Sequence, residues 1–169
     1  MIILFLTMNN PPLLRFATMQ DAPGLSKAVK RLIDDIPYYN DLAKNHETER
    51  YNAHALSEKI KEDPYSVIIA HTENEIAGFC FSRFDDYTIW LEWFGVVKEF
   101  RGARITKQLL QKLEETVIER KCHKIWCDCR TSNQSAIHLL TATGYSQIAT
   151  IKNHWYNQDF IIWERQVAS

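Results

Sequence analysis

The sequence predicts an α/β domain whose mixed, mostly antiparallel sheet carries helices on both faces, and three observations support this. Strand-like runs, either alternating or apolar throughout, are interspersed with segments whose apolar residues recur at helical spacing. Their order is β-α-α-β-β-β-α-β-α-β-β, which combines hairpins with strand-helix-strand units. At 169 residues the chain suits one domain with one core and one active site.

The first strand and helix meet near Thr18. A short strand is expected over 13–17. Thr18 and Asp21 resemble an N-cap and its reciprocal partner, and the apolar residues between Leu25 and Ile33 then recur at helical spacing. We therefore expect a first helix that ends before Pro37, since proline disfavours helical backbone in the residue before it.

Two aromatic residues follow that proline. Tyr38 and Tyr39 are expected to be exposed on the connection to a second helix over 51–61. This connection is either a packed loop or a lid over a substrate, and both tyrosines are candidate substrate-binding residues.

The middle of the chain has the pattern of a hairpin followed by a central strand. The hairpin strands are expected over 66–71 and 76–83, with a polar turn between them. The segment 89–97 is apolar on both alternating sets of positions, as in a strand that is covered on both faces. One carboxylate, Glu92, interrupts it.

The C-terminal half alternates helices with strands. An apolar stripe from Ile105 to Ile118 predicts a helix that ends at Arg120 and Lys121, whose charges suit a helix C-terminus. After it we expect a strand, a helix and a closing antiparallel pair of strands, over 124–130, 132–142, 145–151 and 160–167.

Charge and cysteine content argue against several classes of partner. The net charge of −1 and the pI near 6.6 give no general attraction to nucleic acid or to anionic lipid, so neither partner is expected. The cysteines lack the paired spacing of a zinc site, and we expect reduced core thiols and no metal. They are Cys80, Cys122, Cys127 and Cys129.

The N-terminal segment carries no recognisable targeting pattern. Met1 to Met8 is apolar, but it is too short to span a bilayer and has neither a basic flank nor a small-residue cleavage site. We expect residues 1–11 to be an N-terminal extension of a single domain over 12–169. The expected location is the cytoplasm.

The stretch VVKEFRGARITK at 96–107 is the most informative one, because a strand runs there directly into an amphipathic helix. The first turn of a helix presents unpaired backbone N–H groups and the positive end of the helix dipole, which together can hold a pyrophosphate. Any strand-loop-helix connection with a turn glycine shares this pattern, so an ordinary turn is the alternative.

Two motifs together resemble the GNAT acyltransferase family. Val96, followed five residues later by Arg101 and Gly102, resembles its coenzyme A signature, Arg/Gln-x-x-Gly-x-Gly/Ala. The stretch WCDCRTSNQSAIHLLTATGY at 126–145 resembles its second signature, a strand followed by Asn-x-x-Ala and then Gly-Phe or Gly-Tyr. The similarity covers roughly residues 13–165. It implies the GNAT fold and transfer of an acetyl group from acetyl-coenzyme A to an amine.

The resemblance also implies which residues bind the co-substrate. Backbone groups of Phe94, Gly95 and Val96 would meet the pantetheine arm and the thioester, and Asn133 would lie beside the pantetheine near the acyl end. The residues that would cradle the pyrophosphate are Arg101, Gly102, Ala103, Arg104, Ile105 and Thr106. Neither a metal nor a covalent intermediate is implied.

Three positions depart from the family pattern. Arg104 and Thr106 stand where glycine or a small residue is preferred, which costs little where φ is negative. Leu140 stands where many members place the tyrosine that protonates the departing thiolate. Tyr145 or Tyr156 could substitute, the thiol could leave as thiolate because its pKa is only about 8.5, or the protein could bind coenzyme A without fast turnover.

The reaction needs a base, because only a neutral amine attacks a thioester. Glu92 is one candidate, since an unpaired charge within an apolar strand would be costly. Asp128 is the other, because its position resembles that of the catalytic glutamate of the ribosomal-protein alanine N-acetyltransferases. For each carboxylate the alternative is a structural ion pair, with Arg130 available on the strand face of Asp128.

The leading hypothesis is an N-acetyltransferase in which the amine attacks acetyl-coenzyme A directly in a ternary complex, with Glu92, Asp128 and Tyr156 as catalytic candidates. His154, in the last hairpin, is a further candidate for acceptor binding, with core packing or a loop hydrogen bond as its alternative. The acceptor is a small-molecule or peptide amine, and a homodimer is left open. A non-catalytic coenzyme A sensor and a protein N-terminal acetyltransferase are the alternative functions.

Overall fold

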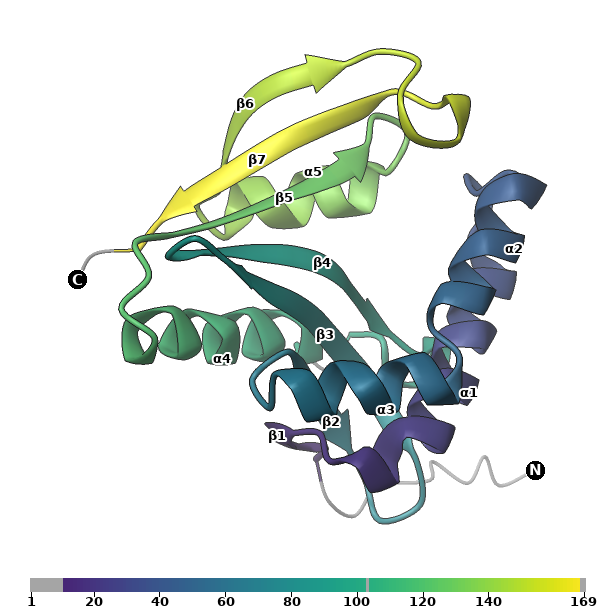
Figure 1. The fold of residues 1–169 in the computed structure, drawn as a ribbon. Helices are drawn as coiled ribbons and strands as arrows, with labels where there is room; N and C mark the ends of the chain where they lie inside the picture. The colour runs from purple at the N-terminus through teal and green to yellow at the C-terminus, as the bar shows by residue number, and fades with distance from the viewer. Residues whose placement is uncertain (1–10, 103, 168–169) are drawn as a thin grey trace, which may run out of the picture.

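A seven-stranded sheet forms the centre of the protein (Figure 1). The computed structural model describes residues 11–102 and 104–167. In chain order the strands are β1 (Leu13–Phe16), β2 (Val67–His71), β3 (Ile76–Asp85), β4 (Thr88–Val96), β5 (Lys124–Arg130), β6 (Ser146–Ile151) and β7 (Phe160–Gln166). Their spatial order is β1-β2-β3-β4-β5-β7-β6, and every neighbouring pair is antiparallel except β4 and β5. This confirms the predicted sheet.

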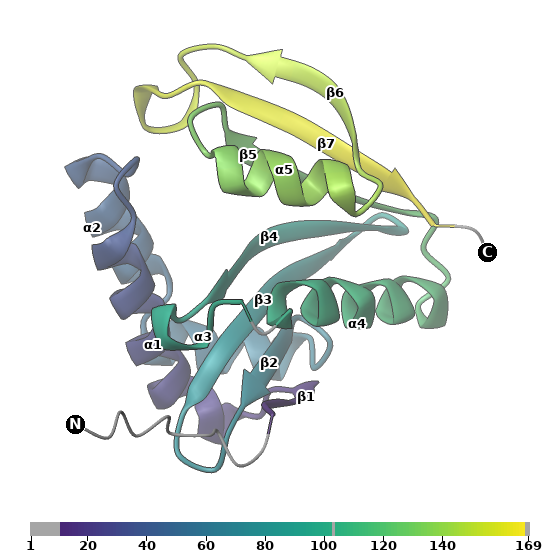
Figure 2. The same cartoon turned by 180° about the vertical axis from the view of Figure 1, so that it is seen from behind.

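The helices cover both faces of the sheet, as predicted. Those of the described residues are α1 (Ala22–Asp35), α2 (Asp41–Arg50), α3 (Ala53–Glu62), α4 (Ile105–Glu119) and α5 (Gln134–Ala142). The view from behind places α4 and α5 in front of the sheet and α3 beyond it, with α1 and α2 to the left (Figure 2). Buried apolar residues of α1 and α3 pack on β2 and β3 in one cluster, and those of α4 and α5 pack on the opposite face in a second.

The structure has three helices before β2, whereas the sequence predicts two. The additional helix, α2, occupies part of the expected connection. Only Ala43 of α2 is buried, so this segment lacks the apolar stripe by which a helix is recognised in a sequence. Asn40 caps it, because its side chain accepts a hydrogen bond from the Ala43 N–H at 2.9 Å. Tyr38 and Tyr39 are half-buried, which corrects the prediction that they are exposed.

The strands β4 and β5 separate after a short parallel stretch. Three residue pairs join them, and these are Ile89–Ile125, Trp90–Trp126 and Leu91–Cys127. Immediately beyond the last pair, β4 carries one extra residue relative to β3 at Glu92. A bulge of this kind bends a strand and disrupts its pairing. The two strands therefore diverge beyond Glu92 and Asp128.

The four cysteines are buried and free, as predicted for core thiols. Burial raises the pKa of the Cys80 thiol to about 12 and also raises that of Cys127, so neither is a reactive thiolate. Within residues 11–102 and 104–167, no helix is both long and apolar enough to cross a membrane. The apolar segment Met1 to Met8 lies outside the described residues.

Candidate active site

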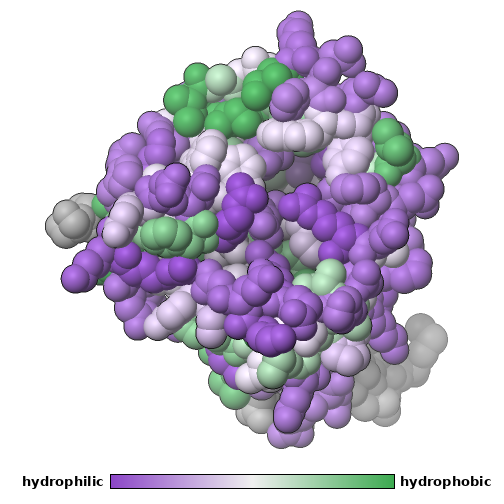
Figure 3. Space-filling model, viewed as in Figure 1, coloured by the Kyte–Doolittle hydropathy of each residue, from purple (hydrophilic) through white to green (hydrophobic). Residues whose placement is uncertain are grey.

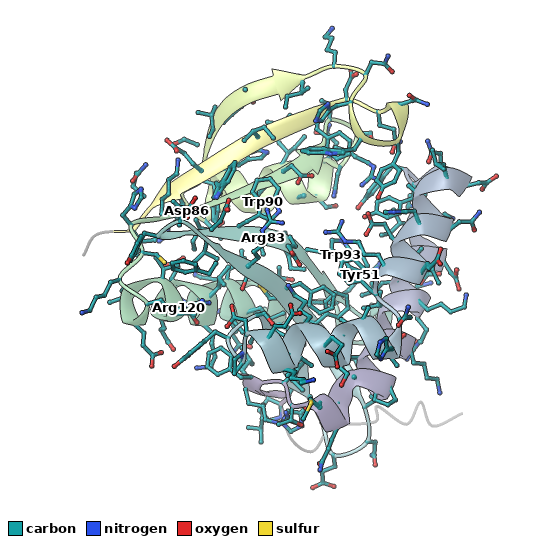
Figure 4. All side chains as sticks on the ribbon, viewed as in Figure 1. Tyr51, Arg83, Asp86, Trp90, Trp93 and Arg120 are labelled. Atoms are coloured by element: carbon teal, nitrogen blue, oxygen red, sulfur yellow. The ribbon has the colours of Figure 1, made fainter. Side chains whose placement is uncertain are left out.

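The divergence of β4 and β5 opens a cleft of about 820 Å³. Its walls come from both strands, from α1 and α5, and from two connections, α1–α2 and β6–β7. On the face seen in Figure 1, Tyr51 and Trp93 lie together and Trp90 lies close to Arg83 (Figure 4). The space-filling view of the same face is hollowed near its centre, where hydrophilic residues surround the hollow (Figure 3). The cleft therefore combines aromatic walls with a charged rim.

One end of the cleft is built by the turn from β4 into α4. Gly102 has a φ of +89°, and a Cβ added there would meet nothing within 4 Å, so its outer side is open. Arg101 and Thr106 line the cleft beside it, and α4 begins at Ile105 with the unpaired N–H groups of a first helical turn. The turn and the helix start thus bring together the residues for which the sequence predicts pyrophosphate binding. Ala103, another predicted contact, lies outside the described residues.

Arg104 has a strained backbone. Its φ is +58° and its ψ is 14°, in the left-handed region that favours glycine. The condition under which the sequence makes this side chain inexpensive, a negative φ, is therefore not met. A residue with a Cβ costs roughly 1–2 kcal/mol in this region, which gives a physical reason for the glycine of the family pattern.

Replacing this residue with glycine should stabilise the protein. Arg104→Gly is expected to raise the free energy of unfolding by about 1 kcal/mol, because the strain is removed and the entropy cost of glycine offsets only part of the gain. Urea denaturation measures this. Arg101→Gly is the matched control, since Arg101 has a φ of −65° and should lose stability on the same change. Equal losses in both variants would contradict the assignment of strain to Arg104.

The middle of the cleft lies between the separated strands. Phe94, Gly95 and Val96 line it on the β4 side, and Asn133 and Leu140 line it on the α5 side. The Asn133 side-chain oxygen caps α5 by accepting the Ala136 N–H at 3.1 Å, which leaves the Asn133 amide nitrogen as a donor. The predicted pantetheine contacts are thus brought together around one space.

Neither of the two tyrosines that the sequence offers in place of the usual one at Leu140 presents a free hydroxyl to the cleft. Tyr145 is buried, it is not among the residues that line the cleft, and its hydroxyl has no partner among the described residues. Tyr156 does line the cleft, but its hydroxyl donates to Glu47 and also contacts His46 Nδ1 at 3.0 Å. Burial and the bond to Glu47 raise the pKa of Tyr156, so its proton is firmly held.

The two candidate bases have different environments. Glu92 is paired with Lys59 at 2.9 Å, which is the structural alternative that the sequence left open. Asp128 forms no ion pair with a described residue, and the expected alternative, a pair with Arg130, is absent because Arg130 Nε donates to Gln158 Oε1 at 2.6 Å. Burial raises the pKa of Asp128 to about 6, with Glu47 adding to the rise while Arg130 and Arg50 oppose it. Asp128 is thus a carboxylate poised to accept a proton near neutral pH.

The α1–α2 connection closes one edge of the cleft against the β6–β7 loop. Asn40 Nδ2 donates to the Tyr156 carbonyl at 2.9 Å, and Gln158 Nε2 donates to the Tyr38 carbonyl at 2.9 Å. The Tyr39 ring lies under the Arg130 guanidinium, 3.9 Å from its central carbon. These contacts explain the partial burial of both tyrosines, and they place Tyr38 and Tyr39 at the cleft.

Among the predicted acceptor residues, His154 lies outside the cleft wall. Its side chain is exposed and its ring packs edge-on against Trp155 at 4.2 Å. Trp155 lines the cleft instead. Tyr156 reaches the cleft through an unusual backbone conformation, a φ of +55°, which turns the loop back toward α2.

Four charged residues of the cleft were not singled out in the sequence: Glu47, Arg50, Arg83 and Asp35. The first two belong to α2, whose polar composition contains no pattern that marks a binding residue. Arg83 could have been found from strand register, since it pairs with Trp90 across β3 and β4 and shares its face.

Comparison with known proteins agrees with this geometry. The family model described as the acetyltransferase (GNAT) family matches residues 28–145. An acetyltransferase of Pectobacterium atrosepticum is 28% identical to the chain over 96 residues, which is 57% of this chain and 68% of that protein.

Solved structures share the fold at low sequence identity. The ribosomal-protein-S18-alanine N-acetyltransferase from Escherichia coli has a TM-score of 0.74 and 15% identity, covering 93% of this chain and 94% of its own. The PaiA N-acetyltransferase from Thermoplasma acidophilum, solved in complex with coenzyme A, has a TM-score of 0.75 and 14% identity, covering 91% of this chain and 98% of its own. Nearly the whole chain therefore adopts this architecture.

Proposed function

This chain belongs to the acetyltransferase (GNAT) family, and on that premise we propose that acetyl-coenzyme A is its donor and that an amine attacks the donor directly in a ternary complex. The observation that carries the proposal is one continuous cleft that runs from the open turn at Gly102 to the buried carboxylate of Asp128. A donor held at the turn and extended along the cleft would bring its thioester toward Asp128. The coenzyme A complex of the PaiA protein adds support.

The donor would be held mainly by backbone groups. The N–H groups around Gly102 and at the start of α4 would bind the pyrophosphate, with Arg101 beside them. The part of β4 that has left β5 retains unpaired backbone groups, and Phe94, Gly95 and Val96 offer these to the pantetheine arm. A backbone N–H from the same stretch would stabilise the oxyanion that forms when the amine attacks.

Asp128 would act as the base. It takes one proton from the acceptor ammonium, and the neutral nitrogen then attacks the carbonyl carbon, so that a C–N bond forms and the C–S bond breaks. The nitrogen gives up its second proton after the C–S bond has broken, and this proton then passes to the released thiolate. Because Leu140 cannot protonate that sulfur and Tyr156 donates to Glu47, the sulfur leaves as thiolate, which is tolerable at a pKa of about 8.5.

We also assign the protein to a reducing compartment, the cytoplasm, on the strength of its four buried free cysteines. The proposed acceptor is a small-molecule or peptide amine. The N-terminus of a protein is one such acceptor, because the position of Asp128 resembles that of the catalytic glutamate of the ribosomal-protein alanine N-acetyltransferases.

Thiol release from acetyl-coenzyme A in the presence of an amine and peptide panel tests the proposal. Release that depends on an acceptor, with the acetylated product found by mass spectrometry, is the expected result. Saturable binding of acetyl-coenzyme A without release for any acceptor would identify a sensor instead. Acetylation of peptides but of no small amine would identify a protein N-terminal acetyltransferase.

A further inference from the structure

The part of the cleft around Asp128, where the amine would bind, is its acceptor side. Three arginines line it, and none of them forms an ion pair with a carboxylate of the described residues. They are Arg50, Arg83 and Arg130. Arg50 and Arg83 are exposed, and Arg83 lies beside Trp90 on the face drawn in Figure 4. A purely cationic acceptor would gain nothing from these guanidinium groups, whereas an acceptor that also carries an anion would be attracted to them.

The acids on this side of the cleft do not balance the arginines. Glu92 is already neutralised by Lys59 at 2.9 Å. Glu47 accepts the Tyr156 hydroxyl and keeps its charge, and Asp128 is needed as the base of the proposed function. Asp35 also lines the cleft, but it borders Val97 and Lys98 at the donor end. Three arginines thus face two carboxylates, Glu47 and Asp128, which leaves an excess of positive charge that a ligand can offset.

Among the three arginines, Arg130 gives the strongest indication of an anion-binding position, because its guanidinium is buried and incompletely paired. The residue is only 8% exposed. Its Nε donates to Gln158, but its Nη2 is buried and has no hydrogen-bond partner among the described residues. The rings of Tyr39 and Phe160 flank the group, with centroids 3.9 and 5.0 Å from its central carbon. A buried donor without an acceptor is costly, and a ligand oxygen would remove that cost.

The spacing of Asp128 and Arg130 fits one small ligand. They stand two positions apart on β5, so their side chains share a face and their Cα atoms are roughly 6.6 Å apart. An amine hydrogen-bonded to Asp128 and a carboxylate hydrogen-bonded to Arg130 can therefore belong to one molecule when few bonds separate the two groups. The α-amino acids meet this condition.

We propose that the acceptor is a small α-amino acid whose amine lies at Asp128 and whose carboxylate binds Arg130. The inference rests on the proposed acetyl transfer and specifies its substrate. Tyr39 covers the Arg130 group and moves aside when the carboxylate binds, because the connection that carries it is tied to the β6–β7 loop by two hydrogen bonds only among the described residues. The aromatic walls, which include Trp155 and Phe160, receive the amino-acid side chain.

Matched pairs of acceptors test the proposal with the unaltered protein. The value of kcat/KM is measured for glycine, methionine and phenylalanine and for the three corresponding amides, which differ only in that a carboxamide replaces the carboxylate. We expect the free acids to be preferred by about tenfold or more, the scale of a charge-assisted hydrogen bond. Intrinsic reactivity opposes this result, because the neighbouring carboxylate favours the unreactive ammonium form of the amine. A preference for the acid must then come from the protein.

Substitution of Arg130 tests whether this residue causes the preference for the free acids over the amides. In Arg130→Gln the ratio of acid to amide should fall to near one, and in Arg130→Lys part of it should return. Lys124→Gln is the matched control, because Lys124 lies on the same face of β5, is paired with Glu164 and does not line the cleft, so this variant should keep the full ratio.

The outcomes separate this inference from the proposed function. Amides that react as well as the acids, or acetylation of other amines but of no amino acid, would overturn the inference and leave acetyl transfer intact. A preference that survives in Arg130→Gln would overturn the assignment to Arg130. Absence of acetylation for every acceptor would overturn both.

Discussion

Asp128→Asn is expected to lower kcat for acetyl transfer by about 10²–10⁴-fold, the usual contribution of a positioned general base. Asparagine keeps the shape of the side chain but cannot take the ammonium proton. Steady-state kinetics at pH 7.5 measure the loss. Glu164→Gln is the control, since this half-buried carboxylate on β7 is paired with Lys124 and lies outside the cleft wall.

The pH profile distinguishes a base from a structural residue. Because burial raises the pKa of Asp128 to about 6, kcat of the unaltered protein should fall about tenfold per pH unit below that value and level off above it. Asp128→Asn should lack this inflection. If Glu92→Gln removes the inflection and Asp128→Asn retains it, the base is Glu92 and the ion pair with Lys59 must open during turnover.

Asp128→Asn should also stabilise the fold. The pKa of Asp128 is higher in the folded protein than the ordinary value of 3.8, so folding disfavours the charged form. The resulting loss of stability develops as the pH rises from about 4 to about 6 and is complete above that range. Asp128→Asn removes it, and we expect a gain of about 2 kcal/mol in the free energy of unfolding at pH 7.5. A variant that is both inactive and less stable would indicate misfolding.

Gly102→Trp is expected to weaken acetyl-coenzyme A binding about 100-fold, because the indole fills the open side of the turn where the pyrophosphate would receive several charge-assisted hydrogen bonds. Calorimetric titration with acetyl-coenzyme A and with coenzyme A measures the change. Gly102→Ala is the matched control. It imposes the same backbone strain at a φ of +89° with almost no added bulk, so it should bind far better than the tryptophan variant. Equal affinities for Gly102→Trp and the unaltered protein would place the donor elsewhere.

Local sequence patterns were sufficient to predict most of the helices and strands. The apolar stripe of α4 recurs along the helix, and the burial of its residues confirms that prediction. The strand β4 does lie inside the sheet, but only its residues Ile89 and Leu91 are buried, because most of the others line the cleft. The helix α2 has no such stripe, since it buries only Ala43, and it could not be recognised. The bulge at Glu92 was equally hidden, because it depends on how β4 pairs with β3.

The candidate site likewise has one part that local sequence patterns could suggest and one part that they could not. The residues proposed to bind the donor are consecutive around Gly102 and along β4, so a motif could suggest them. The acceptor side is assembled from distant segments, and no local pattern connects Arg50, Arg130 and Gln158. Whether Glu92 or Asp128 carries a free carboxylate also depended on Lys59, a residue of α3 that nothing in the sequence links to either of them.

The contact between the α1–α2 connection and the β6–β7 loop has a consequence for biosynthesis. The hydrogen bonds that join Asn40 to Tyr156 and Gln158 to Tyr38 span 116 and 120 positions of the chain. Contacts of such high sequence separation form late, because a long loop must close before they stabilise anything. A chain emerging from the ribosome can build the turn at Gly102, the proposed donor site, well before the proposed acceptor pocket exists. The nascent protein would therefore gain the ability to hold the donor before the ability to use it.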